Sequence, residues 1–271
     1  MTQLPDAGTT AGRTGARSPV LLGLLGLVGF AGLFELLPRI GVLPSEYFPP
    51  TSAIATALAD EGQRPEFWVA FGQTIETWII GLGIAAVAGV LLGLVIGSVP
   101  VLRAATASTI EFLRPIPSVA LIPLVAVLYG NGIESTVILV VYASFWQVLI
   151  QVLAGVADVD PVALDTANSY RLSRLRRAGS LTWPTTLPYA ITGIRLAASV
   201  ALILTITGEL VLGTPGIGRE IEVAYTSSAV DTMYALVVVT GLIGVVANVG
   251  TRAVERRVLA WHPSVRQEVA V

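Results

Sequence analysis

The 271 residues of this chain are too apolar for an ordinary soluble domain: 54% are hydrophobic, 13% are charged, and the mean hydropathy is +0.78. About a quarter of the residues in a soluble domain are charged. The sequence has no cysteine, no lysine and one histidine, and its net charge is −2. It therefore excludes disulfides, a lysine-dependent phosphate loop and a two-histidine zinc site. Nothing in it predicts a catalytic residue, a bound metal or a nucleic-acid partner.

Six apolar blocks are long enough to form membrane-spanning helices, because about 20 helical residues cross a hydrocarbon core about 30 Å thick. In chain order they occupy residues 19–37, 79–99, 101–129, 135–157, 187–212 and 234–254. The sequence therefore predicts an all-α membrane protein with about six transmembrane helices.

The third block, residues 101–129, is the least regular. It carries Glu111, Arg114 and three prolines between positions 115 and 123. Proline removes a backbone donor and kinks a helix interior, and a broken helix inside a bilayer is tolerated only against protein or a water-lined path. We expect this block to be bent and to face the interior of the helix bundle.

The arginines indicate the orientation of the chain. With six spans, the N-terminus, the loops after the second and fourth spans and the C-terminal tail share one side of the membrane. Eleven arginines fall on that side and three on the other: Arg13, Arg17, Arg103, Arg171, Arg174, Arg176, Arg177, Arg252, Arg256, Arg257 and Arg266 against Arg39, Arg64 and Arg219. The positive-inside rule then places both termini in the cytoplasm. The complete preference for arginine over lysine is typical of a GC-rich bacterial genome, so we expect a multi-pass protein of a bacterial cell membrane.

The predicted organisation has three parts. Residues 1–18 form a disordered cytoplasmic tail, residues 19–262 the transmembrane domain, and residues 263–271 a cytoplasmic C-terminal tail. The first apolar block follows two arginines, as in a secretory signal. Because Glu35 and Pro38 end that block without a small-x-small cleavage site, we expect an uncleaved helix.

Two features that could suggest chemistry have simpler interpretations. The glycine-rich run at residues 213–218 has the wrong spacing for a dinucleotide-binding loop and predicts a turn between spans. His262 lies beyond the last span and is interpreted as an interfacial residue.

The most polar interruption, residues 158–186, follows the fourth span on the predicted cytoplasmic side. Asp160 followed by Pro161 is a typical helix start, with aspartate as N-cap and proline at the first helical position. We expect a helix to about Tyr170 and a second start capped by Ser173. The loop would project as two short helices joined by a sharp turn; alternatively, it is an amphipathic connector whose arginines meet anionic lipid.

The same loop contains Asp165-Thr166-Ala167, then Arg171, then Leu181-Thr182-Trp183-Pro184. This pattern resembles the signature of the inner-membrane permease subunits of ABC importers, in particular the branch that moves nitrate, sulfonates and taurine. The family signature is Glu-Ala-Ala, a glycine four residues later, and then a hydrophobic residue, any residue and Leu-Pro. Further segments resemble family landmarks in the right order, at residues 49–58, 112–130, 155–161, 192–210 and 213–218. The resemblance covers about residues 20–262.

The most consequential departure from the signature is Arg171, which occupies the position of the usual glycine. If that turn needs positive φ, a side chain there costs roughly 1 kcal/mol or more. The departure predicts a turn of different shape, a divergent partner ATPase or an adjusted contact.

The resemblance implies a type I ABC importer permease fold and a division of labour. An extracytoplasmic binding protein would deliver a small organic or anionic solute, two permease copies in a homodimer would form the path through the lipid, and two separate ATPase subunits would use ATP and Mg²⁺. This chain would be no enzyme and would hold no cofactor. Its loop would contact the ATPase through Asp160, Asp165, Thr166, Ala167, Asn168, Tyr170, Arg171, Leu172, Arg174 and Arg177.

Polar residues within the apolar blocks are candidates for the translocation path. An ionisable side chain inside a bilayer costs a few kcal/mol and usually faces the bundle interior or water. We expect four residues to face the path: Glu76, Arg114, Gln147 and Glu209. The alternative is an ion-coupled secondary transporter of a small solute, in which such carboxylates carry protons or sodium.

Overall fold

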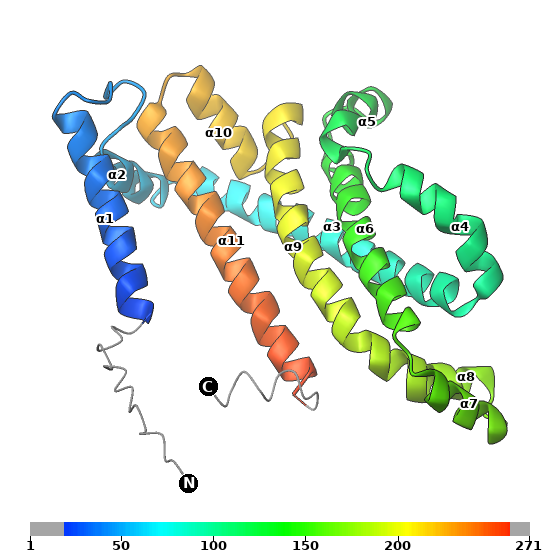
Figure 1. The fold of residues 1–271 in the computed structure, drawn as a ribbon. Helices are drawn as coiled ribbons and strands as arrows, with labels where there is room; N and C mark the ends of the chain where they lie inside the picture. The colour runs from blue at the N-terminus through cyan, green and yellow to red at the C-terminus, as the bar shows by residue number, and fades with distance from the viewer. Residues whose placement is uncertain (1–18, 261–271) are drawn as a thin grey trace, which may run out of the picture. The chain divides into compact units, whose positions relative to one another are not determined.

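The computed structural model describes residues 19–260, and the regular structure of these residues is helical (Figure 1). The helices longer than five residues are α1 (Pro19–Arg39), α2 (Thr51–Glu61), α3 (Pro65–Ser98), α4 (Pro100–Leu113), α5 (Ile122–Tyr129), α6 (Ile133–Ala157), α7 (Pro161–Ser169), α9 (Trp183–Leu212), α10 (Ile217–Thr226) and α11 (Val230–Val258). Three short elements complete the order: the 3₁₀ turn η1 (Ser118–Leu121), α8 (Arg174–Arg177) and the π-helical turn η2 (Ala178–Thr182). The predicted tails at residues 1–18 and 263–271 lie outside the described residues, as does His262.

The chain divides into two compact units, one ending at Thr56 and one beginning at Ala57. In the first unit, the end of α1 caps the start of α2. Glu35 Oε2 accepts a hydrogen bond from the Ser52 backbone N–H at 2.8 Å, and Arg39 contacts Glu35 Oε1 at 2.6 Å. A carboxylate at a helix N-terminus satisfies an orphan donor and complements the helix dipole.

Five helices of the described part are long and apolar enough to cross a membrane: α1, α3, α6, the run Arg174–Leu212 that contains α9, and α11. A sixth candidate is the pair formed by Pro100–Leu113 and Ser118–Tyr129, which is bent by 80°. The structure thus confirms about six spans and a break in the third block. Tyr142 of α6 holds the break by donating its hydroxyl to the Leu113 carbonyl at 2.8 Å.

Helix α3 is longer than the predicted second span. It begins at Pro65 and has 34 residues, which at 1.5 Å each give about 51 Å, well beyond a hydrocarbon core of about 30 Å. The first part of α3 was not predicted as membrane-spanning, because Glu66, Gln73 and Glu76 interrupt the apolar pattern there. Just before it, Arg64 contacts the buried Glu61 at 2.7 Å, and this hydrogen bond raises the pKa of the guanidinium.

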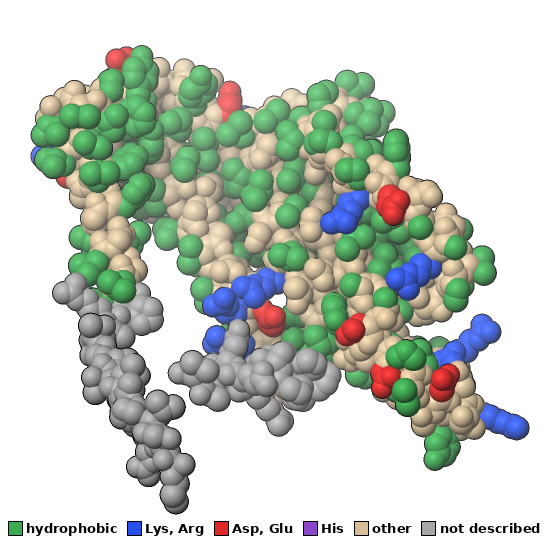
Figure 2. Space-filling model, viewed as in Figure 1, with side chains coloured by type: hydrophobic (Ala, Val, Ile, Leu, Met, Phe, Trp, Pro, Cys, Tyr) green, Lys and Arg blue, Asp and Glu red, His purple; other side chains and the backbone are tan. Residues whose placement is uncertain are grey.

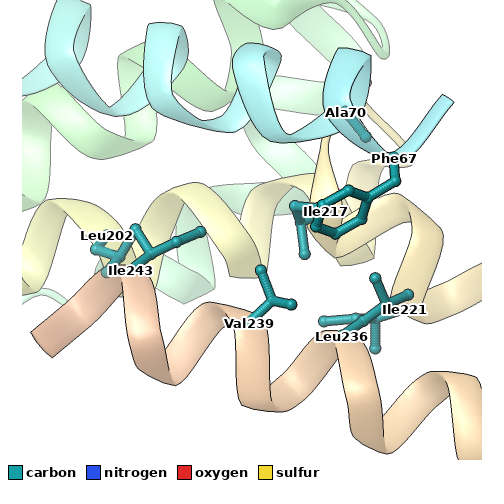
Figure 3. Packing of buried hydrophobic residues seen from close by; sticks show 8 residues of the cluster. All are labelled: Phe67, Ala70, Leu202, Ile217, Ile221, Leu236, Val239 and Ile243. Atoms are coloured by element: carbon teal, nitrogen blue, oxygen red, sulfur yellow. The ribbon is translucent and has the colours of Figure 1, made fainter. Parts of the chain in front are cut away.

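The predicted turn between spans is confirmed at residues 213–216, where Gly213 (φ +68°) ends α9 and Gly216 (φ +153°) precedes α10. Helix α10 itself was not predicted, because its ten residues mix apolar and charged side chains and contain a glycine. Its apolar face packs on α3, α9 and α11 in a cluster that includes Phe67, Ile217, Ile221 and Leu236 (Figure 3).

Glycines of α3 bring that helix close to α6. A Cβ built on Gly89 would lie 2.7 Å from Val148 Cβ, and one on Gly93 would lie 2.6 Å from Val152 Cγ1. Small residues allow this close approach between membrane helices. Val148 and Val152 also contact α9 residues in one core cluster, so α3, α6 and α9 form the centre of the second unit.

Candidate coupling surface and translocation path

Helices α7 and α8 lie between the end of α6 and the start of α9, at one end of these long helices (Figure 1). Asp160 Oδ1 accepts a hydrogen bond from the Val162 N–H at 2.9 Å, and Ser173 Oγ accepts one from the Arg176 N–H at 3.4 Å. Both predicted N-caps are therefore confirmed. We call residues 160–177, which contain both helices, the knob.

The turn inside the knob closes at Arg171. The Arg171 N–H donates to the Asn168 carbonyl at 2.9 Å, and the Leu172 N–H donates to the Ala167 carbonyl at 3.0 Å. These two bonds form a Schellman motif, which places the residue after the C-cap in the left-handed region. Arg171 has φ +54°, so the expected change of turn shape is wrong: the turn keeps the conformation that favours glycine, and the arginine adopts it.

Further contacts hold the knob together. Arg177 Nη1 donates a hydrogen bond to Asn168 Oδ1, and Ala167 is buried. Asp165, Thr166 and Arg174 are exposed, and the Thr166 hydroxyl donates to the Val162 carbonyl at 2.8 Å. A cleft of about 990 Å³ separates the knob from the α3–α4 turn and is lined in part by Asp165, Asn168, Arg174 and Arg177. The structure thus brings several of the predicted loop residues together.

Apolar side chains project from the knob beside its arginines. Tyr170 is 78% exposed, Leu175 87% and Val162 71%, and both side-chain types stand out at this end in Figure 2. Exposed apolar groups rimmed by polar ones are typical of an interaction site. Val162 and Leu175 were missed in the sequence, although each is an apolar residue in the first turn of a helix with a recognisable cap.

The residues predicted to line a path do not form one cluster. Glu76 on α3 and Arg114 at the end of α4 are exposed, and Gln147 on α6 is half-buried. Among residues 19–260, no hydrogen bond or ion pair links these three to one another. Glu209 is different, because it is completely buried by its own chain and accepts hydrogen bonds from Thr74 and Gly218.

A second membrane-embedded charge has a partner that the sequence did not suggest. Arg195 of α9 contacts Glu255 of α11 through an Nη1–Oε2 distance of 3.2 Å, and both side chains are partly buried. Glu255 stands next to Arg256 and Arg257, so in the sequence it reads as part of a charged helix end.

Comparison with known proteins places this architecture in a family. Residues 65–260 match the family described as the binding-protein-dependent transport system inner membrane component. The taurine transport system permease protein TauC of Escherichia coli (strain K12) is 28% identical over 222 residues, which cover 80% of this chain and 81% of TauC. The bicarbonate transport system permease protein CmpB of Synechocystis sp. is 26% identical over 250 residues, covering 86% and 87% of the two chains.

Solved structures of ABC transporters share the fold. An amino acid ABC transporter matches with a TM-score of 0.60 and 16% identity over 71% of this chain and 94% of that chain. A bacterial ABC transporter involved in the import of alginate matches with a TM-score of 0.61 and 17% identity over 88% and 96%.

The helical bundle with its projecting knob is thus the membrane-embedded permease of an ABC importer. The chain belongs to the binding-protein-dependent transport system inner membrane component family. It is a multi-pass inner-membrane subunit, and in this family a separate subunit hydrolyses ATP and a binding protein supplies the solute. Membership favours this function over the ion-coupled secondary transporter.

Proposed function

We propose that this permease imports a small anionic or organic solute and that the knob is its contact with the ATPase. Relatives named for taurine, bicarbonate, nitrate and aliphatic sulfonates support the solute class. These solutes share a small size and an anionic group, although the binding protein would select among them.

The proposed contact with the ATPase rests on how the two helices of the knob are held together and on which side chains they expose. Two helices of nine and four residues are too short to be stable alone. Caps, a Schellman turn and the Asn168–Arg177 bond hold them in one body. That body projects Tyr170, Leu175 and several arginines. A rigid body attached directly to α6 and α9 can transmit the closing of an ATPase dimer to those helices.

The rest of the assembly follows from this proposal. Both termini and the knob face the cytoplasm, where two ATPase subunits bind ATP and Mg²⁺. A second copy of this chain completes the path in a homodimer, with the surrounding lipid covering the remaining apolar surface. The binding protein docks at the opposite end, where α9 turns into α10.

We further propose that Glu76, Arg114 and Gln147 line the path. Each offers a charged or amide group that is not enclosed by the described part of this chain, as a solute-facing group must be. Glu209 could meet a solute directly only if α10 moved away from it. Replacing Glu76, Arg114 and Gln147 together by apolar residues should reduce flux in reconstituted vesicles. Unchanged flux would show that these residues do not line the path.

The proposal is tested by charge reversal in the knob. The permease would be co-expressed with its ATPase and binding protein, purified, and reconstituted in vesicles. Asp165→Arg and Arg171→Glu should reduce both the ATPase recovered with the permease and the ATP-dependent uptake. Arg256→Glu, which reverses an exposed charge on α11, is the matched control and should keep both. Full recovery and full uptake in both knob variants would contradict the proposed contact.

A further inference from the structure

Glu209 joins three helices at the end of the bundle opposite the knob. Its Oε2 accepts hydrogen bonds from the Gly218 N–H and the Thr74 hydroxyl, both at 2.9 Å. The Thr74 oxygen in turn accepts the Ile217 N–H at 2.9 Å. A single carboxylate on α9 therefore holds the first turn of α10 and also contacts α3, and it is favoured there by the positive end of the α10 dipole.

The glycine-rich turn fits around this carboxylate. A Cβ on Gly216 would collide with the Glu209 carboxyl group, and one on Gly218 would lie 2.7 Å from Glu209 Cβ. Gly216 also has φ +153°, where a side chain is strained. The glycines at 216 and 218 thus allow the α10 backbone to reach the acid, which gives this run a structural purpose beyond turning the chain.

Helix α10 is held mainly along one face. Ile217 and Ile221 belong to one buried cluster with residues of α3, α9 and α11, and Ile221 lies beside Leu236 of α11 (Figure 3). On the other side of the helix, Arg219 and Tyr225 are exposed. A helix of ten residues is marginal without such packing. The position of α10 therefore depends on this buried apolar cluster, which we call the seat, and on the hydrogen bonds at the N-terminus of the helix.

The second carboxylate oxygen of Glu209 is energetically unfavourable when α10 covers it. Glu209 is 0% exposed, and its Oε1 is buried without a hydrogen-bond partner in the described part of the chain. A half-satisfied buried carboxylate is unfavourable in a low-dielectric interior, and water would reach it if α10 lifted. This gain opposes the loss of the apolar packing and of the two hydrogen bonds to Oε2. The seated and lifted positions of α10 are therefore closer in free energy than they would be if both carboxylate oxygens had hydrogen-bond donors.

We propose that Glu209 is a positioning residue that holds α10 as a movable latch against α3 and α9. The role of the latch in transport rests on the proposed function, because it requires α10 to face the binding protein. The existence of the latch does not, and it can be measured separately.

The chain has no cysteine, so an introduced thiol reports on the latch without background. Ala224, on the buried face of α10, is 5% exposed. In the complete complex in nanodiscs, Ala224→Cys should react slowly with a maleimide. Adding Glu209→Ala should raise the rate about tenfold, equivalent to about 1.4 kcal/mol, because two donors lose their acceptor. Glu209→Gln retains an acceptor oxygen and should change the rate by less than about twofold.

Two controls separate a latch from general loosening. Asp231→Asn, which neutralises an exposed acid at the start of α11, should leave labelling at position 224 unchanged. A second reporter, Ser135→Cys at a position in α6 that is 0% exposed, should react equally slowly with and without Glu209→Ala. An equal acceleration at both reporters, or none at position 224, would overturn the proposal.

If Glu209→Ala fails to fold, Thr74→Val provides the same test, since it removes the acceptor of the Ile217 N–H and one donor to Glu209. It should raise labelling at position 224 about threefold, and an unchanged rate would overturn the latch. In transport assays, the loosened variants should hydrolyse ATP with less dependence on the binding protein. A wild-type complex without ATP-driven uptake would instead contradict the proposed function and leave the labelling result standing.

Discussion

Arg177 donates a hydrogen bond from Nη1 to Oδ1 of Asn168 and so joins α8 to the last turn of α7. The two residues lie nine positions apart, on either side of the turn at Arg171. Asn168 also uses its carbonyl to accept the Arg171 N–H. One residue therefore closes the turn with its backbone and joins the two helices with its side chain.

Removing the side-chain bond should loosen the knob. We expect Asn168→Ala to reduce the number of solutes imported per ATP hydrolysed, because a less rigid knob transmits less of the motion of the ATPase. The effect on the free energy of unfolding should stay below about 1 kcal/mol, since the pair is near solvent. Ser169→Ala is the control: its hydroxyl bonds only within α7, to the Asp165 carbonyl, and its uptake-to-hydrolysis ratio should match the wild type.

The left-handed conformation of Arg171 predicts that glycine would stabilise the knob. A non-glycine residue with positive φ is strained by about 1–2 kcal/mol, and part of the gain from glycine is lost to the greater freedom of the unfolded chain. Arg171→Gly should therefore be more stable than Arg171→Ala by about 1 kcal/mol in thermal unfolding of the purified permease.

The comparison with Arg171→Ala separates strain from charge, because both variants lose the guanidinium and only glycine relieves φ. Equal stabilities would show that the turn relaxes in solution. If Arg171→Gly is more stable and couples ATP hydrolysis to uptake less well, the arginine side chain contributes to the ATPase contact despite its strain.

Features that depend on neighbouring residues could be predicted from the sequence. Asp160 and Ser173 were recognised as caps because a cap bonds to an N–H two or three positions further on. The bend in the third block could be predicted from Pro115 and Pro117. Each lacks a backbone N–H and therefore interrupts the helical hydrogen bonds at its own position. The resemblance to a permease family also rested on motifs that are continuous in the chain.

Features made by distant residues could not be predicted in this way. Thr74 and Glu209 are separated by 135 positions, and Arg195 and Glu255 by 60. In the sequence, each of these acids is only a charge in or beside an apolar block. Glu209 was therefore interpreted as a path residue, and its hydrogen bonds with Thr74 of α3 and Gly218 of α10 could not be foreseen. The path residues themselves stay predictions, because solute and partner subunits define which surfaces face the path.

The Arg195–Glu255 pair should contribute to the packing of α9 against α11. A double-mutant cycle with Arg195→Gln, Glu255→Gln and the double variant isolates this contribution. We expect a coupling free energy of about 1 kcal/mol, because the pair is partly buried and one distance of 3.2 Å joins it. The measurement is thermal unfolding in one detergent, and additive single effects would show that the pair adds nothing.

The close contact between α3 and α6 predicts how the melting temperature changes when a glycine of α3 is replaced. Gly89 faces Val148 so closely that a Cβ would lie 2.7 Å from Val148 Cβ and 3.2 Å from the Leu149 nitrogen. Backbone and a β-branched side chain cannot move aside easily, so Gly89→Ala should force the two helices apart. Overpacking of this kind costs about 1–3 kcal/mol, and the melting temperature should fall accordingly.

Gly83 provides the matched control on the same helix, because a Cβ there has no neighbour within 4 Å. Gly83→Ala should be neutral or stabilising by up to about 1 kcal/mol, since alanine restricts the unfolded chain and favours the helix. The two substitutions add the same methyl group to α3 and differ only in what it meets. A lower melting temperature for Gly89→Ala than for Gly83→Ala is therefore a direct measure of the α3–α6 contact, and equal values would contradict this packing.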